Sequence, residues 1–225
     1  MNGLSDSIIQ EFVRSLENIF FELIISGYYS MKKEKNYNLE MEEEDLSVEL
    51  IKQMDKQPLR SKYHISVLPE TRYYDDVIYN HIKKAKQAKR PDIIIITWIT
   101  SMQINYEIKY YIEAKNLSEE DWKKSGNKTP VDAKKQKKRY IETGIDNFVK
   151  ENYPKEGCLT GYIVQGEPDT IVSDINNILT TTHPTRKSEL LKNQFTVRKY
   201  PFCYSSEHMI AHKKKITLKH FFLKL

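Results

Sequence analysis

The sequence predicts an α/β fold, in which helices flank a β-sheet and one further helix is added at the N-terminus. The first observation is a pair of apolar runs rich in Ile and Tyr, at residues 93–97 and 106–114, which predict adjacent strands. The second is a series of longer segments with apolar residues at three- and four-residue steps, typical of amphipathic helices. The third is size: 225 residues, 39% of them hydrophobic, suit one domain with a sizeable core.

The N-terminal segment, residues 1–45, is interpreted as a helix and a charged loop, and residues 46–225 as the main domain. Residues 4–30 predict one long amphipathic helix with Ser5 or Asp6 as its N-cap. An apolar stripe of this length must be buried against other apolar residues. We therefore expect it to pack on the rest of the domain, or to mediate a homodimer or the binding of a partner protein.

The remaining elements follow from the same periodicities. The acidic run at residues 42–45 is interpreted as the solvated first turn of a helix, where the helix dipole favours carboxylates. The predicted elements after it, in chain order, are a helix at 45–56, a strand at 63–68, a helix at 71–88, the two central strands, a polar loop at 116–130, a helix at 131–152, a strand at 158–165, a helix at 170–179, and strands at 195–198 and 216–223 on the sheet edge.

Charge is distributed unevenly along the chain. Residues 1–112 carry 15 Lys and Arg against 17 Asp and Glu, a net charge of −2, whereas residues 113–225 carry 21 against 14, a net charge of +7. A basic half suits an anionic polymer such as nucleic acid, and it equally suits a Lys-rich solvated surface. Two cysteines are too few for a disulfide framework or a thiolate cluster. With no signal peptide and no apolar run long enough to span a bilayer, we expect a cytoplasmic protein without a membrane partner.

The central strands carry charges that need a physical reason. Asp92 stands at the start of the first strand, and Glu113 and Lys115 stand near the end of the second. Alternate side chains of a strand point to opposite faces, so Glu113 and Lys115 share one face while Ile112 and Ala114 share the other. A carboxylate and an ammonium side by side on an apolar strand favour a metal site that cuts phosphodiesters. The plainer alternative is an ion pair on a solvated face, with Asp92 as a turn residue.

These residues resemble the PD-(D/E)xK nuclease superfamily. The matching positions are Pro91-Asp92 before one strand and Glu113-Ala114-Lys115 at the end of the next, over about residues 46–180. The following helix carries Gln136 and Tyr140, which is similar to the Q-x-x-x-Y element of the recombination-exonuclease branch. The resemblance implies a restriction-endonuclease-like three-layer core around a mixed β-sheet. It also implies a Mg²⁺-dependent deoxyribonuclease, such as a defence or restriction endonuclease.

The resemblance also implies a role for each residue. Asp92, Glu113 and the Ala114 carbonyl would hold Mg²⁺, with Mn²⁺ as a substitute, because Mg²⁺ takes oxygen ligands. Lys115 would orient or help to deprotonate the attacking water, or stabilise the developing charge. Gln136 and Tyr140 would be catalytic residues as well, because they would hold Lys115 or a phosphate of the cut strand. The basic half of the same helix would follow a DNA backbone through Lys134, Lys135, Lys137, Lys138 and Arg139.

Three alternatives remain open. The chain could be a non-catalytic nucleic-acid-binding or assembly subunit that keeps the nuclease fold. It could instead be a different enzyme using Ser205, His208 and His220, although no nucleophile-elbow motif accompanies them. His208 and His212, four residues apart, could bind zinc from one helix face. Separately, Trp122 lies in the Lys-rich loop, where it is either a surface aromatic or a platform for a nucleic-acid base.

Overall fold

The structure, a computed structural model, describes residues 6–70, 72, 89–101, 104–125, 129–153, 157–182, 186, 189–210 and 214–225. The predicted helix at 71–88, including His81, lies almost wholly outside these residues. The described helices are α1 (Asp6–Glu34), α2 (Glu43–Asp55), α3 (Pro58–Lys62), α5 (Ala133–Arg139), the π-helix η2 (Tyr140–Ile145), α6 (Asp146–Val149) and α7 (Pro168–Thr182). The strands are β1 (Ser66–Pro69), β2 (Ile93–Ser101), β3 (Ile104–Ser118), β4 (Gly157–Gln165), β5 (Lys192–Val197), β6 (Tyr200–Met209) and β7 (Lys215–Lys224).

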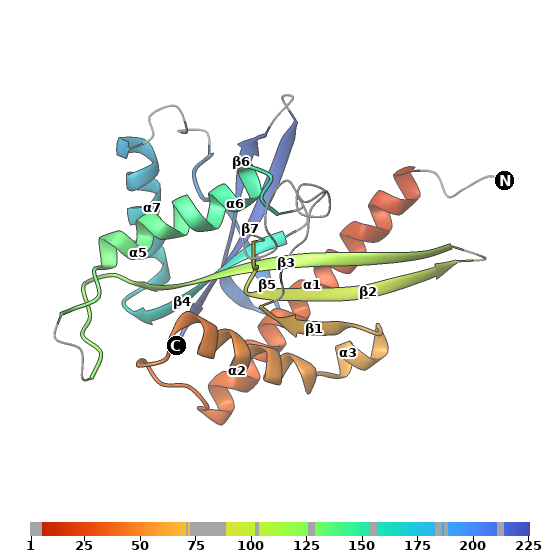
Figure 1. Cartoon of the computed structure of the whole chain (residues 1–225), viewed down its shortest axis with the longest axis horizontal. Helices are drawn as coiled ribbons and strands as arrows, with labels where there is room; N and C mark the ends of the chain where they lie inside the picture. Colours follow the sequence, from red (N-terminus) through yellow and green to blue (C-terminus); the bar gives the residue numbers. More distant parts are fainter. Residues whose placement is uncertain are drawn as a thin grey trace.

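The described strands form one mixed sheet in the order β1-β2-β3-β4-β7-β6-β5. β2 and β3 are a long antiparallel hairpin that extends well beyond the rest of the sheet (Figure 1). β3, β4 and β7 run parallel to one another, β6 runs antiparallel to β7, and β5 runs antiparallel to β6. The predicted α/β class, with helices flanking a mixed sheet, is therefore confirmed.

Two apolar clusters cover the two faces of the sheet. Alternate residues of β2 separate cleanly between them: Ile93 and Ile95 join one cluster, and Ile94 and Ile96 the other. The first cluster contains the buried sides of α1 and α2, and the second contains those of η2, α6 and α7. Burial on both faces explains why β2 begins as an uninterrupted apolar run, as buried central strands do. Figure 1 shows α5 and α6 on the opposite side of the sheet from α1.

The N-terminal helix packs within this molecule. Phe20, Leu23, Ile24 and Met31 of α1 are almost completely buried, and they share a cluster with residues of the sheet. Contact with α2 is close enough that a Cβ on Gly27 would lie 2.6 Å from the Cγ of Met54. The predicted stripe is thus covered largely by the chain itself.

The C-terminal strands differ from the prediction. The segment at 216–223 was expected at the sheet edge, but β7 lies inside the sheet between β4 and β6, and only β5 of this region is at an edge. β6 was not predicted, because Ser205, Ser206, Glu207 and His208 interrupt its apolar residues. In the structure, three of these four polar side chains are buried, so hydrophobic alternation could not reveal the strand.

The helix predicted at 131–152 is present as the continuous succession α5, η2 and α6. Asp132 caps its start, because its side chain accepts a hydrogen bond of 2.8 Å from the Lys135 N–H. The π-helical turn in the middle lies against β4, where a Cβ on Gly144 would come within 2.8 Å of Leu159. No helix in the described part of the chain is both long and apolar enough to span a membrane.

Candidate active site

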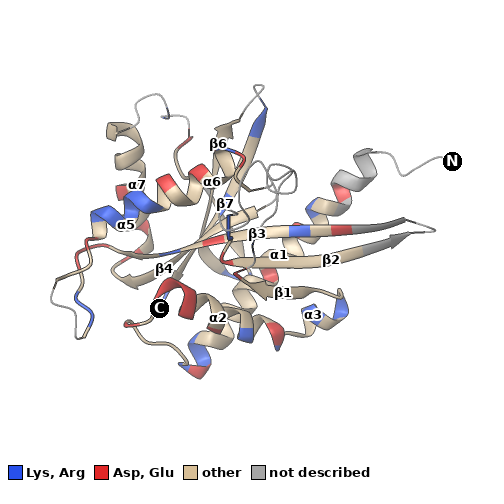
Figure 2. Cartoon of the chain, viewed as in Figure 1, with Lys and Arg blue, Asp and Glu red and all other residues tan. Residues whose placement is uncertain are grey.

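The sheet brings Asp92, Glu113 and Lys115 together. Asp92 immediately precedes β2, which pairs with β3 so that Ile93 lies opposite Ile112. The Asp92 carboxylate accepts a hydrogen bond of 2.6 Å from the Ala114 N–H, which ties the start of β2 to the middle of the EAK sequence. Figure 2 shows acidic and basic segments meeting where β3 crosses the sheet centre. Ile112 and Ala114 point to the other face of β3 and are fully buried in the first apolar cluster, as the alternation of strand side chains predicts.

The ammonium of Lys115 lies at the centre of the group. Its Nζ is 2.8 Å from Glu113 Oε1 and 3.9 Å from Asp92 Oδ2, and it donates a 2.5 Å hydrogen bond to the Ala114 carbonyl. A third carboxylate, that of Glu43, approaches to 3.4 Å. One cation therefore faces three carboxylates, which leaves excess negative charge when all three are ionised.

This charge cluster is nearly closed to solvent. The exposed fraction of the side chain is 4% for Lys115, 7% for Glu113, 12% for Asp92 and 20% for Glu43. Burial and the neighbouring Glu113 raise the pKa of Asp92 to about 7, and burial raises the pKa of Glu113 as well. Burial alone would lower the pKa of Lys115, but the three carboxylates outweigh it and the pKa is raised. The lysine is consequently a fixed positive charge, whereas Asp92 titrates near neutrality.

Two members of the cluster were not identified from the sequence. Glu43 is the first residue of α2, in the acidic run that was interpreted as a solvated helix turn. That interpretation holds for the exposed Glu44 and Asp45 but is wrong for Glu43, which is turned toward Lys115. Tyr153 follows α6 and donates a 2.9 Å hydrogen bond to Glu113 Oε2. No sequence pattern marks either residue, because both reach the site from distant parts of the chain.

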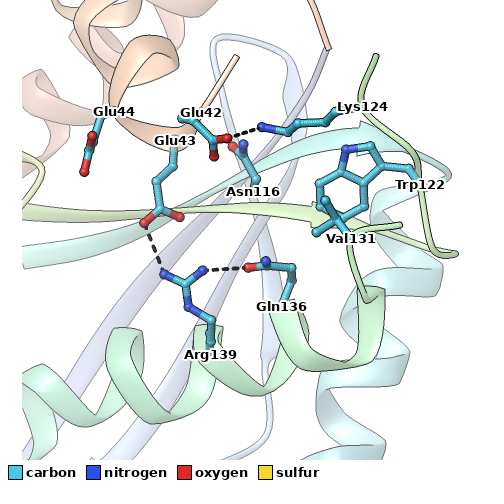
Figure 3. A pocket seen from close by; sticks show the side chains of 9 residues that line it. All are labelled: Glu42, Glu43, Glu44, Asn116, Trp122, Lys124, Val131, Gln136 and Arg139. Carbon is cyan, nitrogen blue, oxygen red and sulfur yellow. Dashed lines mark hydrogen bonds and ion pairs between the residues drawn. The ribbon is translucent and has the colours of Figure 1, made fainter. Parts of the chain in front are cut away.

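Gln136 and Arg139 lie beside the cluster and join it through Glu43. The Arg139 guanidinium is 3.6 Å from Glu43 Oε1 and donates a 3.1 Å hydrogen bond to the Gln136 side-chain oxygen (Figure 3). Both residues line a cavity of about 280 Å³ whose walls come from α2, β3, α5 and the loop after β3. Gln136 is thus linked to the cluster through Arg139 and Glu43, and its predicted role of holding Lys115 or a phosphate stays a prediction.

The structure does not bring Tyr140 to the site. Its ring is fully buried, and its hydroxyl lies 2.9 Å from the Nδ1 of His220. The phenol ring packs instead against His220 and Phe222 in the second apolar cluster. The role predicted for Tyr140, holding Lys115 or a phosphate, does not fit this position, because the first turn of η2 faces the core.

The basic residues of α5 divide into two groups. Lys134 and Lys135 are exposed, and Lys138 and Arg139 are partly exposed, as a nucleic-acid-facing surface requires. Lys137 differs, because it is buried and its Nζ pairs with Asp174 of α7 at 2.5 Å and with the Glu119 carbonyl at 2.9 Å. The predicted phosphate contact therefore does not fit Lys137, whose ammonium already joins two elements.

The Ser/His alternative centres on Ser206 and not on Ser205. The Ser206 hydroxyl lies 2.6 Å from His208 Nε2 and 2.7 Å from His220 Nε2, and His208 Nδ1 lies 2.7 Å from Glu189 Oε2. These are the distances of a nucleophile, base and orienting acid. Ser206 and both histidines are nearly or fully buried, however, and burial lowers the pKa of His220 far below its usual value. A hydroxyl closed off from solvent suits a polar network within the core.

The zinc alternative is wrong in its geometry. It placed His208 and His212 on one helix face, but His208 belongs to β6, and His212 lies outside the described residues. Among the described residues, no three His, Cys, Asp or Glu side chains are arranged so that they could hold a metal ion as they stand. At the Asp92–Glu113–Glu43 cluster, the ammonium of Lys115 lies among the oxygens instead.

The donor set of this cluster nevertheless suits a hard divalent cation. Mg²⁺ binds carboxylate and carbonyl oxygens, which are the atoms that Asp92, Glu113, Glu43 and Ala114 present. Burial first, and then the repulsion from Glu113 and Glu43 that Lys115 only partly opposes, raise the pKa of Asp92. A divalent ion would relieve this repulsion.

Comparison with known proteins adds no relative. No protein-family model matches the chain, and neither the curated proteins nor the solved structures compared with it include a match. Any class assigned to the protein therefore depends on the sheet, the buried charge cluster and the neighbouring cavity.

Proposed function

We propose that the protein is a metal-dependent nuclease that hydrolyses phosphodiester bonds of DNA, with a restriction-endonuclease-like core. The observation that carries the proposal is the buried arrangement of Asp92, Glu113 and Glu43 around the Lys115 ammonium. A purely structural ion pair needs one carboxylate. Even with Arg139 beside Glu43, the cluster keeps Asp92 and Glu113 close to a single buried lysine, which is costly for folding. Such a cost is typical of catalytic sites, where perturbed pKa values concentrate.

Each residue then has a definite task. Asp92, Glu113, Glu43 and the Ala114 carbonyl provide the oxygen atoms for Mg²⁺ or Mn²⁺. When bound, the ion acidifies water and offsets the charge that develops on phosphorus. Lys115, held cationic by its neighbours, stabilises the same charge and positions the water. Tyr153 fixes one oxygen of Glu113 through its hydroxyl, and exposed lysines of α5 hold the DNA backbone.

The decisive experiment is cutting of DNA by the purified chain. We expect cutting with Mg²⁺ or Mn²⁺ and none with chelator. Asp92→Ala, Glu113→Ala and Lys115→Ala should each lower the rate by about a hundredfold or more, as loss of an electrostatic catalytic group does. Thermal unfolding of each variant checks that the protein stays folded, and Asp55→Ala on the exposed end of α2 is the matched control. Full cutting by the Lys115→Ala protein would show that the residue roles are wrong.

A non-catalytic nucleic-acid-binding subunit is the second candidate. It is favoured by one observation, the position of the Lys115 ammonium among the oxygens that would otherwise hold the metal. This candidate predicts DNA binding that is indifferent to Mg²⁺ and unchanged in Glu113→Gln. Absence of cutting on linear, circular and single-stranded DNA and on RNA, together with such binding, would decide in its favour.

A further inference from the structure

The cavity beside the charge cluster is built from four separate parts of the chain. Its walls are the first turn of α2, the end of β3, the loop after β3 and the exposed side of α5. Figure 3 shows the Trp122 ring and Val131 on one side, Glu43 on the opposite side, and the Gln136 and Arg139 side chains between them. Glu43 belongs both to this wall and to the Lys115 cluster, so the two sites are contiguous.

The aromatic wall is held firmly in place. The backbone of Trp122 makes a two-residue antiparallel bridge with Val131, with N–O distances of 3.3 and 2.7 Å. The facing side of the cavity is fixed through the carbonyl of Met41, which accepts hydrogen bonds from Asn116 Nδ2 and Lys124 Nζ at 3.1 and 3.3 Å. An indole fixed by a backbone bridge offers a flat stacking surface that loses little entropy when a ligand binds.

Two polar atoms of residues that line the cavity have no hydrogen-bond partner. The side-chain oxygen of Asn116 and the indole Nε1 of Trp122 are buried without a hydrogen-bond partner, and the Asn116 residue is 5% exposed. Buried polar atoms are seldom left unpaired in the absence of a function. The Asn116 oxygen is an acceptor, so a ligand that pairs with it needs a donor on its edge. The indole N–H of Trp122 lies in the plane of its ring, so a ligand stacked on that ring does not pair with it.

Charge and size restrict what that ligand is. Three carboxylates, of Glu42, Glu43 and Glu44, line the cavity against two cations, Lys124 and Arg139, which pair with Glu42 and Glu43 at 2.7 and 3.6 Å. The paired lining leaves one carboxylate in excess, which favours an uncharged ligand over an anion. A volume of about 280 Å³ lies just below the range of about 300–1,000 Å³ that is usual for small-molecule sites, so one ring system fits and a base pair does not. A flat, uncharged heterocycle with donors and acceptors on its edge meets all these conditions.

We propose that this cavity binds a single unpaired nucleobase, stacked on Trp122 and hydrogen-bonded at its edge by Gln136 and Asn116. The proposal rests on the proposed function, since it assigns a place to one base of the strand that is cut. It also names the substrate class, which is DNA with an unpaired nucleotide. A base must leave the base stack to enter the cavity, as it does in a single-stranded segment, at a frayed end or at a flipped position. Arg139 lines the cavity and lies beside Glu43, which also belongs to the charge cluster. The sugar-phosphate attached to the base would pass this arginine on its way to the cluster.

The test uses Trp122 as its own reporter. The chain has two tryptophans, so in a Trp98→Phe protein the indole fluorescence comes from Trp122 alone. Titration with the four deoxynucleoside monophosphates, in chelator, should quench this fluorescence, and deoxyribose 5-phosphate should not. By calorimetry, Trp122→Ala should weaken binding of the best mononucleotide by about tenfold, the usual effect of losing a base-stacking aromatic. Trp98→Ala, which removes an exposed tryptophan of β2, is the matched control and should bind like the unaltered protein.

Several outcomes would overturn the inference. Equal quenching by deoxyribose 5-phosphate would identify an anion site, and no quenching by any mononucleotide up to its solubility would exclude a base site. Unchanged affinity in Trp122→Ala would exclude stacking. The binding assay needs neither metal nor cutting, and it should give the same result in Glu113→Gln. Base binding without DNA cutting would therefore refute the nuclease alone, and cutting without base binding would refute the base site alone.

Discussion

Asp92 is the residue whose ionisation most directly links stability to function. In the folded chain its pKa is raised from 3.8 to about 7, so folded Asp92 keeps a proton that the unfolded chain releases. A raised carboxyl pKa means that stability is greatest below pH 4 for this group and declines as pH rises through 7. A divalent cation would replace the proton, so its affinity for the site should increase with pH up to about 7.

Asp92→Asn should therefore stabilise the protein, and more so at high pH. In chelator at about pH 8, we expect its free energy of unfolding to exceed that of the unaltered protein by on the order of 1–3 kcal/mol, because the buried charge is removed. At about pH 3.5, below the unfolded pKa of 3.8, the difference should nearly vanish. Urea unfolding at both pH values measures it, with the exposed Asp55→Asn as control. A difference independent of pH would contradict the raised pKa.

Tyr153 is predicted to tune Glu113. Burial raises the pKa of Glu113, and the hydrogen bond from Tyr153 opposes that rise. Removing the bond in Tyr153→Phe should move the acidic limb of the pH–rate profile for DNA cutting to higher pH. The rate at neutral pH should fall by about tenfold, as expected for loss of a hydrogen bond to a charged group. Tyr37→Phe, remote from the cluster, should keep the original profile, and an unshifted profile in Tyr153→Phe would rule out this role.

At the scale of elements, helix α5 has a buried structural side and an exposed basic side. Lys137 points inward to Asp174 and the Glu119 carbonyl, and so fastens α5 to α7 and to the end of β3. Lys134 and Lys135, which precede Lys137 by less than one helical turn, are exposed. The helix can therefore hold the wall of the cavity in place while its outer lysines contact a phosphate backbone.

This division gives a salt-dependence prediction. If Lys134 and Lys135 each contact a phosphate, the double change to Ala should reduce the slope of log affinity for DNA against log salt by about 2. Lys137→Met should leave the slope unchanged and instead lower the melting temperature, because Asp174 loses its partner. Fluorescence anisotropy on one labelled duplex across a salt series measures the slopes. Equal slopes in the double variant and the unaltered protein would exclude α5 as the DNA-binding surface.

The hairpin of β2 and β3 is the other element with a double role. Its inner half carries Asp92, Glu113 and Lys115 in the buried part of the sheet. Its outer half extends past the sheet in Figure 1, with Trp98 exposed on β2.

At the scale of the whole molecule, α1 belongs to the same core as the sheet. Its buried residues contact strands from the middle and from the C-terminal part of the chain. Phe21 lies against Tyr110 of β3 and Phe221 of β7, and the Tyr28 hydroxyl donates a 2.5 Å hydrogen bond to the Lys224 carbonyl. The helix therefore closes one face of the sheet instead of standing apart as an accessory.

Removal of α1 should accordingly abolish folding. A shortened chain beginning at Lys35 exposes the apolar residues of one sheet face, and the burial lost from Phe20, Leu23 and Ile24 alone is worth about 1.5–3 kcal/mol each. We expect no cooperative unfolding transition by circular dichroism. Deleting residues 1–5 is the control and should leave the transition intact. A shortened chain that unfolds cooperatively would mean that residues 46–225 are an independent domain.

Some of the site could be predicted because it depends on local periodicity. Glu113 and Lys115 share a face because strand side chains alternate, and Asp92 lies near them because β2 and β3 are consecutive in the chain and pair antiparallel. The apolar patterns of α1, β2, β4 and α7 likewise indicated their elements. In each of these cases the relevant neighbours lie within one element or one hairpin.

Other features followed only from how distant elements pack. Glu43 and Tyr153 reach the cluster from α2 and from the segment after α6. Strand β7 lies beside β4 although paired residues such as Cys158 and Lys219 are 61 positions apart in the chain. Tyr140 and Lys137 turn into the core because the rotation of the α5–η2 helix is set by its packing on the sheet and α7. Local sequence patterns predict most of the elements, with β6 as an exception, and the charged trio on the central hairpin. The tertiary structure decided what surrounds that trio, because the rotation of a helix and the position of a strand in a sheet depend on contacts that no local pattern contains.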